Sequence, residues 1–268
     1  MTSRADRLSE NLWTAPPSEK SSALSGCRPV TTLRLDNAEV DLWAADLSIS
    51  PSSADALGGL LSEDERARSE RFHSRDNAAR FIAARGLLRN ILGHYAGIPP
   101  VRLRFRPGPF GKPALTPETG GDRVRFSSSR SGRLAVYAVA RGREIGIDVE
   151  KVRTEFDFEP IVRSFFSERE RTILRRLSFE ERPGAFFTFW TLKEAAVKGI
   201  GTGLSLPLHR LDTSTAWEDP SKPIEIDVQG ERSRWMLRKW TDLPAGYRAA
   251  LAVRCRYGRN ATPSAQID

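Results

Sequence analysis

Four charged side chains stand in two short patterns whose spacing could support chemistry. Asp148 and Glu150 are separated by one apolar residue, so on a strand both carboxylates lie on the same face. Glu194 and Lys198 are four positions apart, so on a helix they share a face. Neighbouring carboxylates repel each other unless a cation lies between them. If this strand and this helix pack together, they predict a divalent-metal site with an ammonium group beside it.

Each pattern alone also has a simpler interpretation. Asp148 and Glu150 could lie on the solvated face of an edge strand. Glu194 and Lys198 could form a surface ion pair that contributes only about 0.3 kcal/mol. The flanking sequences instead favour a position at the edge of a core, because both segments are strongly apolar. The apolar neighbours are Ile145, Ile147 and Val149 on the strand and Phe186, Phe187, Phe189 and Trp190 on the helix.

Composition limits the class of protein. The chain has 268 residues, of which 39% are hydrophobic, enough for one large domain or two small ones. Its net charge of +8 favours an acidic partner, which could be nucleic acid, an anionic cofactor or an acidic protein. The cysteines Cys27 and Cys255 allow no disulfide framework, and the three histidines lack metal-ligand spacing, which argues against a zinc centre.

No segment predicts passage through a membrane. The longest apolar run, Leu134–Ala140, is too short to span a bilayer, and the N-terminus lacks an apolar signal-peptide core. A cytoplasmic protein is therefore expected. Residues 1–38 are rich in Ser, Pro and charge, so we expect a mobile N-terminal extension there, and we expect residues 258–268 to be a C-terminal tail.

Two helices and several strands are expected in the first half. Ser62 and Glu65 have the spacing of a capping box at the start of a charged helix. Apolar residues recur at helical spacing from Arg75 to Tyr95, and the Gly97–Pro100 turn should end that helix. Short strands are expected at 40–44, 102–105, 124–127 and 134–139.

The second half repeats this order. Residues 167–170 resemble 62–65, the helix around Glu194 resembles the one around Arg85, and the segment around Gly246 resembles the one around Gly132. The three offsets are 105, 109 and 114 positions, which is nearly constant. We therefore expect two similar α+β halves, 39–143 and 144–257. A cleft between two such halves is a common place for a ligand.

The two charged motifs together resemble the signature of a known family. Gly146–Glu150 (G-I-D-V-E) and Trp190–Lys198 (W-T-L-K-E-A-A-V-K) are similar to the paired motifs of the 4′-phosphopantetheinyl transferases, in particular the surfactin-synthetase-activating type. The resemblance covers residues 40–257 and extends to four further segments: Gly111–Pro113, Phe126–Gly132, Phe165–Ser167 and Gly203–Leu208.

The resemblance implies a fold, an activity and a metal site. The fold would be two α+β halves related by a pseudo-twofold axis, with the active site in the cleft between them. The reaction would move 4′-phosphopantetheine from coenzyme A to a serine of an acyl- or peptidyl-carrier protein, releasing adenosine 3′,5′-bisphosphate. Asp148, Glu150 and Glu194 would bind Mg²⁺, or Mn²⁺ in its place, and Lys198 would contact the pyrophosphate. The base would be Glu194 or a metal-bound water.

The resemblance also indicates which residues would bind coenzyme A. Lys112, Ser129 and the residue at 130 would hold phosphates of coenzyme A. The family usually has histidine at 130, where this chain has Arg130, and positions 127 and 128 also depart from the usual Asn–apolar pair. Arginine can bind phosphate through two nitrogens, so we expect the role to persist. The basic residues expected to line the nucleotide are Arg68, Arg75 and Arg80; each could instead lie on a solvated helix face.

The expected partners follow from the same resemblance. Carrier proteins are acidic around their serine, which suits the positive charge of this chain. Phe165 and Phe166 could dock apolar carrier side chains, or both could belong to the core. A monomer without membrane or nucleic-acid partners is expected. Two alternatives stay open: a basic nucleic-acid-binding protein, although no platform of interleaved aromatic and basic residues is evident, and an inactive binder of coenzyme A.

Overall fold

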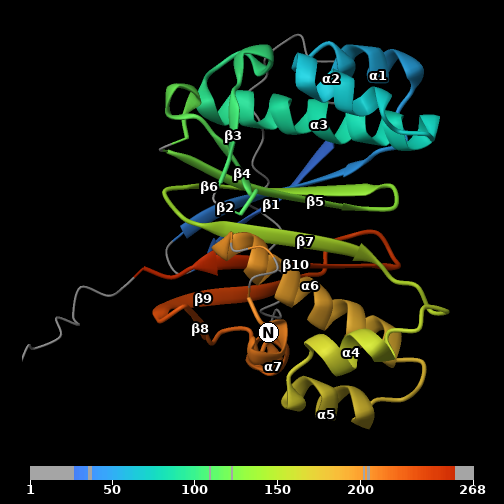
Figure 1. The fold of residues 1–268 in the computed structure, drawn as a ribbon, viewed down its shortest axis with the longest axis vertical. Coiled ribbons are helices and arrows are strands. Elements are labelled where there is room, and N and C mark those ends of the chain that lie inside the picture. The colour runs from blue at the N-terminus through green and yellow to red at the C-terminus, as the bar shows by residue number, and fades with distance from the viewer. Residues whose placement is uncertain are drawn as a thin grey trace, which may run out of the picture.

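Two four-stranded antiparallel sheets form the centre of the structure (Figure 1). The computed structural model describes residues 27–35, 38–108, 110–121, 123–201, 203 and 206–256. The first sheet has the order β1-β2-β6-β5 and the second the order β7-β10-β9-β8. The strands of the first sheet are β1 (Cys27–Leu35), β2 (Ala38–Asp46), β5 (Val124–Ser131) and β6 (Leu134–Arg141). Those of the second are β7 (Ile145–Lys151), β8 (Ile224–Val228), β9 (Glu231–Trp240) and β10 (Tyr247–Arg254).

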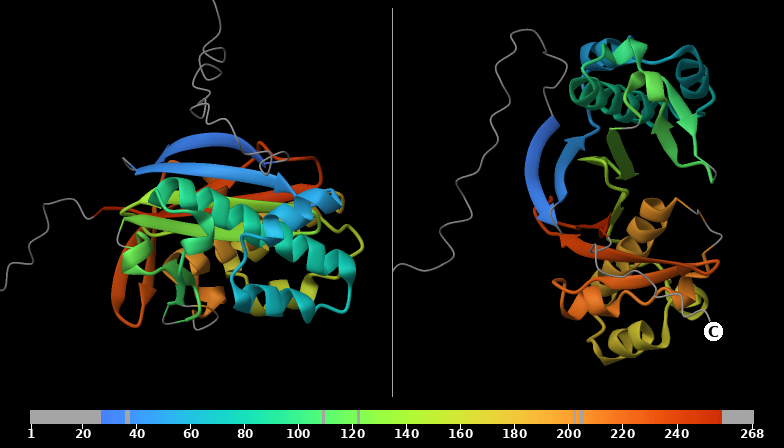
Figure 2. Two further views of the ribbon diagram at one scale, coloured as in Figure 1. Left: turned by 90° about the horizontal axis from the view of Figure 1, so that it is seen from above. Right: turned by 90° about the vertical axis from the view of Figure 1, so that its left-hand side faces the viewer.

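Helices cover the outer side of each sheet, so the two helical layers lie at opposite ends of the molecule (Figures 1 and 2). The first layer contains α1 (Pro51–Gly58), α2 (Glu63–Glu70) and α3 (Arg75–Ala96), and the second contains α4 (Glu159–Phe165), α5 (Glu168–Arg176), α6 (Arg182–Ile200) and α7 (Ser214–Glu218). Short elements complete the fold: η2 (Pro100–Arg102), β3 (Phe105–Pro107), β4 (Pro113–Leu115), η3 (Pro117–Thr119) and η5 (Leu208–Arg210). The expected α+β class is confirmed.

The two sheets have the same strand order within each half. In the first, the strands β2, β6 and β5 are neighbours, which is the order first, third, second along the chain. In the second, β7, β10 and β9 have that same order. Buried residues from both sheets form one apolar cluster between them, which includes Val40, Val136, Ile147 and Leu251. We therefore propose that 39–143 and 144–257 are two copies of one unit.

The predicted helix ends agree with the observed ones. The capping box at Ser62 and Glu65 is present, and so is its counterpart at Ser167 and Glu170. The helix α3 ends at Gly97, which adopts the left-handed conformation (φ 68°) that glycine tolerates best.

Each half also buries an ion pair behind its capping box. Arg89 on α3 donates to Glu65 at 2.6 Å, and Lys193 on α6 lies 2.8 Å from Glu170. The two acids are 105 positions apart and the two cations 104, which matches the offset of the proposed repeat. Each cation also donates to two backbone carbonyls, those of Pro100 and Leu103 in the first half and of Leu208 and Leu211 in the second.

Two expectations differ from the structure. The segment Cys27–Leu35, expected within a mobile extension, forms β1 and pairs antiparallel with β2. The strand expected at 102–105 is displaced, because Pro100–Arg102 form the turn η2 and β3 begins only at Phe105. The remaining residues of the expected extension, 1–26 and 36–37, and the expected tail at 258–268 lie outside the described residues.

Candidate functional site

Glycine at 146 lets α6 approach β7 closely enough to bring the two charged motifs together. A Cβ atom at Gly146 would lie 2.0 Å from the carbonyl oxygen of Ala195 and 2.3 Å from the backbone nitrogen of Gly199. A Cβ at Gly199 would in turn lie 2.6 Å from the ring of Trp235. No other residue fits either position without moving the helix, so the two glycines fix the distance between strand and helix.

Two of the four motif residues, Asp148 and Lys198, are in direct contact. The side chain of Asp148 is 3% exposed, and its Oδ1 accepts hydrogen bonds from Ser129 Oγ at 2.7 Å and from Lys198 Nζ at 2.6 Å. Lys198 Nζ also donates to Ser129 Oγ at 2.9 Å, so the three groups form a closed triangle. Glu150 accepts from Ser131 Oγ at 2.7 Å. The expected meeting of Lys198 with a carboxylate of the strand is thus observed.

The hydroxyl groups that hold these carboxylates come from the other half. Ser127, Ser129 and Ser131 occupy alternate positions on β5, which lies beside β7. The outer two also accept from backbone nitrogens of β7: Ile147 N donates to Ser127 Oγ at 3.0 Å, and Lys151 N donates to Ser131 Oγ at 3.1 Å. We call these three residues the serine row. Sequence reasoning missed the roles of Ser127 and Ser131, although serine at every second position of a strand was a usable signal.

The carboxylates carry more negative charge than Lys198 can neutralise. Burial raises the pKa of Glu194 above its ordinary value, and the nearby Asp148 and Glu150 raise it further, while Lys198 lowers it. Burial also raises the pKa of Glu150; its bond from Ser131 acts in the opposite direction, and the charge of Asp148 adds to the rise. Because Asp148 raises the pKa of both glutamates and Glu150 raises that of Glu194, the three acids form one electrostatic cluster.

This cluster predicts that Glu194→Gln stabilises the ligand-free protein. Because the folded pKa of Glu194 is raised, its contribution to stability is full below the unfolded value of 4.5 and is lost as pH rises through the folded pKa. Glutamine removes that loss. In EDTA we expect the melting temperature of Glu194→Gln to exceed wild type by about 2–4 °C at pH 7.5, and the difference to shrink towards pH 4.5.

The same melting experiment on Glu225→Gln is the control, because Glu225 is exposed on β8, outside the cluster. A Glu194→Gln protein that melts at or below the wild-type temperature at pH 7.5 would contradict the prediction.

The cluster fits a hard divalent cation, with one rearrangement. Asp148 Oδ2 is buried and has no hydrogen-bond partner. The atoms available to bind a metal ion here are carboxylate and hydroxyl oxygens, the ligand type that Mg²⁺ prefers. Across the described residues, however, no three Asp, Glu, His or Cys side chains are gathered as they would be around an ion. Lys198 occupies the position next to Asp148 Oδ1 instead. Its side chain is 31% exposed, so the ammonium group has room to turn away.

Of the arginines expected to bind coenzyme A, Arg68 and Arg130 lie together, whereas Arg75 and Arg80 do not join them. The guanidinium groups of Arg68 and Arg130 both lie over the ring of Phe81, at 5.5 and 6.0 Å from its centroid. Burial lowers the pKa of Arg130, and the charge of Arg68 lowers it further. Two adjacent like charges of this kind favour an anion between them. Arg75 is exposed at the start of α3 and Arg80 is half-buried on the next turn.

The expected phosphate ligand Lys112 is engaged elsewhere. Its ammonium group donates to the carbonyl oxygens of Ile145 at 2.8 Å and Gly199 at 3.0 Å, and it lies 3.5 Å from Glu144. Ser129, which was expected to hold a phosphate, is bonded to Asp148 and Lys198. In this structure both residues therefore bond to protein groups of the site.

A cavity of about 280 Å³ lies beside Glu194 and Lys198, between the two halves. One wall is Phe110–Pro113 and Phe126–Ser128 from the first half, and the other is Glu194, Val197, Lys198, Gly201 and Gly203. A second, larger cavity of about 810 Å³ shares only Phe110 with it and is lined mainly by β8, β9 and residues 206–211. None of the clustered carboxylates lines that second cavity, so the smaller one is the candidate ligand site.

The fold and the site define a class of protein. Three carboxylates and a lysine stand at the boundary between two α+β units, with an adjoining cavity and a pair of arginines near by. This arrangement is typical of an enzyme that handles a phosphorylated ligand with a metal ion. Within the part of the chain that the structure describes, no helix is long and apolar enough to cross a membrane.

Comparison with known proteins makes the class specific. A family model of the 4′-phosphopantetheinyl transferase superfamily matches residues 144–252. The chain is 38% identical over 194 residues to the 4′-phosphopantetheinyl transferase HetI of a Nostoc species, covering 72% of this chain and 81% of that protein. It is 26% identical over 208 residues to the 4′-phosphopantetheinyl transferase Sfp of Bacillus subtilis, covering 78% of this chain and 88% of that one. The chain belongs to the 4′-phosphopantetheinyl transferase superfamily.

Proposed function

We propose that this protein transfers 4′-phosphopantetheine from coenzyme A to a serine hydroxyl of an apo acyl- or peptidyl-carrier protein, with Mg²⁺ or Mn²⁺ and in the cytoplasm. The observation that supports this best is the joining of Asp148, Ser129 and Lys198 beside Glu194 and a cavity between the halves. The named relatives HetI and Sfp carry the same activity in their names.

The reaction mainly requires that the negative charge of the pyrophosphate of coenzyme A be neutralised, and it needs no covalent bond between enzyme and substrate. The carrier serine oxygen forms a bond to the phosphorus that bears pantetheine, and the bond from that phosphorus to the bridging oxygen breaks. Adenosine 3′,5′-bisphosphate leaves with the bridging oxygen, and the serine proton goes to a base. Lys198 would stabilise the charge that develops on the leaving phosphate. Glu194 or a water molecule held at the site would accept the proton. In the ligand-free protein burial raises the pKa of Glu194, which makes this carboxylate a stronger base. If Glu194 binds the metal ion, the water would take this role.

The metal ion would be held by Asp148, Glu150 and Glu194, and when bound it would neutralise the pyrophosphate. The serine row would orient two of these ligands, because Ser129 and Ser131 donate to Asp148 and Glu150. Ligand hydrogen bonds of this kind fix the direction of a carboxylate and so keep the site ready for its ion.

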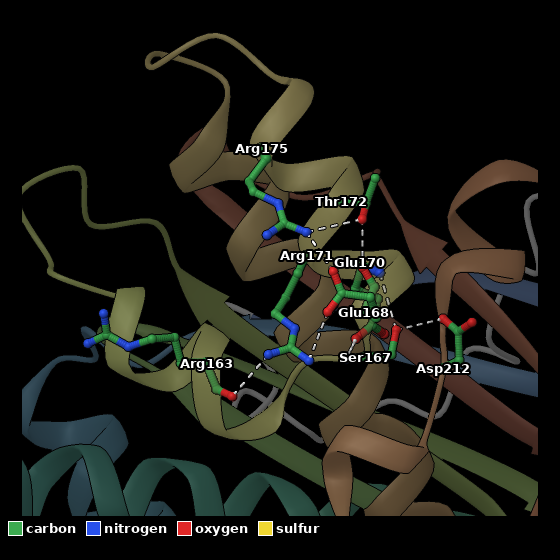
Figure 3. Close-up of polar contacts among 8 residues, drawn as sticks. All are labelled: Arg163, Ser167, Glu168, Glu170, Arg171, Thr172, Arg175 and Asp212. Carbon is green, nitrogen blue, oxygen red and sulfur yellow. Dashed lines mark hydrogen bonds and ion pairs between the residues drawn. The ribbon is translucent and has the colours of Figure 1, made fainter.

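The surface of α4 and α5 suits the acidic carrier. Figure 3 shows Arg171 and Arg175 on α5 converging on Glu168, at 3.2 and 2.7 Å. The neighbouring Arg163, at the end of α4, is exposed and its backbone carbonyl accepts from Arg171. Together with the exposed Glu159 on α4, Glu168 gives two carboxylates against three arginines, so this group keeps a positive charge. Of the two phenylalanines proposed for docking, Phe166 is fully buried in the core, while Phe165 is 39% exposed.

A carrier-labelling assay tests the function. The protein is incubated with Mg²⁺, a fluorescent coenzyme A analogue and purified apo carrier proteins of the fatty-acid, polyketide and non-ribosomal peptide types. Label is expected on the carrier serine, and a carrier with that serine replaced by alanine is the control. If no carrier in the panel acquires label, the proposed function is wrong.

Arg130 is expected to bind the 3′-phosphate of coenzyme A, because a guanidinium group can hold a phosphate through two nitrogens. We expect Arg130→Ala to weaken coenzyme A binding about 10- to 100-fold, the loss of one charge-assisted phosphate contact, and to leave dephospho-coenzyme A binding nearly unchanged. Titration calorimetry with both ligands measures this. Arg133→Ala is the matched control, because Arg133 lies on the same hairpin but pairs with Asp46 at 2.9 Å. Equal losses for both ligands would remove the 3′-phosphate role.

A further inference from the structure

One lysine of the first half reaches the last turn of the helix that carries Glu194 and Lys198. Lys112 lies in the hairpin between β3 and β4, and its ammonium group donates to Ile145 O at 2.8 Å and to Gly199 O at 3.0 Å. The side chain is only 22% exposed. Burial lowers the pKa of Lys112, and the nearby Glu144 raises it.

Both carbonyl groups need a donor from outside their own element. Gly199 lies in the last turn of α6, where backbone carbonyls have no partner within the helix and where the helix dipole is negative. Ile145 begins β7, which is an edge strand of its sheet, so carbonyls on its outer side have no strand partner. A single ammonium group, with three donors and a positive charge, satisfies both and adds Glu144 at 3.5 Å.

The position of these bonds relates them to the proposed reaction. The hairpin forms one wall of the 280 Å³ cavity, and α6 forms the other with Glu194 and Lys198. Lys198 immediately precedes Gly199, the residue whose carbonyl Lys112 holds. A Cβ on Gly201, at the end of the same helix, would lie 3.5 Å from Lys112 Cδ, so the lysine stem also packs against the helix terminus.

We propose that Lys112 is a positioning residue that fixes the last turn of α6 against β7 and the hairpin, and so sets the place of Lys198, instead of binding a phosphate itself. Its effect on catalysis rests on the proposed function, but its effect on the ligand-free protein does not. A displacement of about 1 Å at a reacting group can cost about 100-fold in rate, so a residue of this kind affects kcat before it affects KM.

The experiment compares Lys112→Met, which keeps the length of the stem and removes the donors, with wild type. Hydrogen exchange of the ligand-free protein is followed at the amides of 197–201 and 145–147. We expect exchange there to be at least about tenfold faster in Lys112→Met, because an unheld helix terminus opens more often. In the carrier-labelling assay we expect kcat to fall about 10- to 100-fold, with KM for coenzyme A within about threefold of wild type.

The control is Lys222→Met, which removes an exposed lysine from a 3.4 Å pair with Asp219 and should change neither measurement. Wild-type exchange together with a raised KM for coenzyme A would overturn the proposal and make Lys112 a phosphate ligand. Should Lys112→Met not fold, Lys112→Arg is measured in its place. We expect faster exchange there too, since a guanidinium group cannot place one nitrogen between the two carbonyls; wild-type exchange would overturn the proposal. If wild type itself transfers nothing, the exchange measurement still decides the role of Lys112.

Discussion

Replacing Asp148 by asparagine is expected to lower the transfer rate by about 10²- to 10³-fold, the loss typical of removing one preorganised charged group from an active site. Asp148 connects the two motifs, because Ser129 of β5 and Lys198 of α6 both donate hydrogen bonds to its Oδ1. Asparagine keeps the size of the side chain but removes its charge and replaces one oxygen by a donor. It can therefore neither bind a metal ion as strongly nor hold Lys198 as an ion pair.

The matched control is Asp41→Asn on β2. Asp41 is a partly buried aspartate whose oxygens accept from Thr32 and Tyr95, so the chemical change is the same in a place without catalytic residues. Carrier labelling at saturating Mg²⁺ and coenzyme A gives the rates, and circular dichroism confirms the fold. If Asp148→Asn keeps its rate within about threefold of Asp41→Asn, Asp148 is not part of the catalytic site.

The second large effect is on stability. Replacing Lys193 by methionine is expected to lower the free energy of unfolding by about 3–5 kcal/mol, because it leaves a buried charge unpaired. Lys193 and Glu170 are both 0% exposed and 2.8 Å apart. Lys193 further donates to the carbonyl groups of Leu208 and Leu211, which would also lose their donor. Urea denaturation, followed by tryptophan fluorescence, measures the loss.

A double variant separates the ion pair from packing. In Lys193→Met/Glu170→Gln the unpaired charge is gone, so we expect a substantial part of the lost stability to return. Arg169→Met is the exposed comparison, because Arg169 pairs with Glu218 on the surface, and exposed pairs contribute about 0–1 kcal/mol. A double variant that is less stable than Lys193→Met would show that Glu170 stabilises the fold mainly through its bonds to Ser167 and Thr213.

Much of the local structure could be predicted from the sequence because its causes are local. Alternation of apolar and acidic residues placed Asp148 on a strand face opposite Ile147, and the structure agrees. The capping box at Ser62 and the glycine at 97 marked helix ends, since both act within a few residues. The spacing could suggest that Asp148 and Lys198 meet only if the strand and the helix pack together, and the resemblance to a family supported that packing, because no spacing rule joins residues 50 positions apart.

The rest depends on contacts between distant segments. The strand β1 was missed because it lies in a segment rich in Ser, Pro and charge, although its own Val30–Leu35 stretch has the β-branched residues typical of a strand. Lys112 was expected to bind phosphate, and only the packed structure places Ile145 O and Gly199 O around its ammonium group. Likewise, nothing near Lys193 in the sequence indicates a fully buried ion pair with Glu170.

The serine row also decides how the two sheets meet. Between β6 and β5, or between β7 and β10, backbone groups bond directly in a continuous ladder. Between β5 and β7, Ser127 and Ser131 instead accept from backbone nitrogens of β7 through their hydroxyl groups, and a hydroxyl can both accept and donate. A water molecule can stand in for a hydroxyl at little cost in free energy, whereas it cannot replace a ladder. The border between the two sheets is therefore bridged by side chains, and Asp148 and Glu150 lie along it.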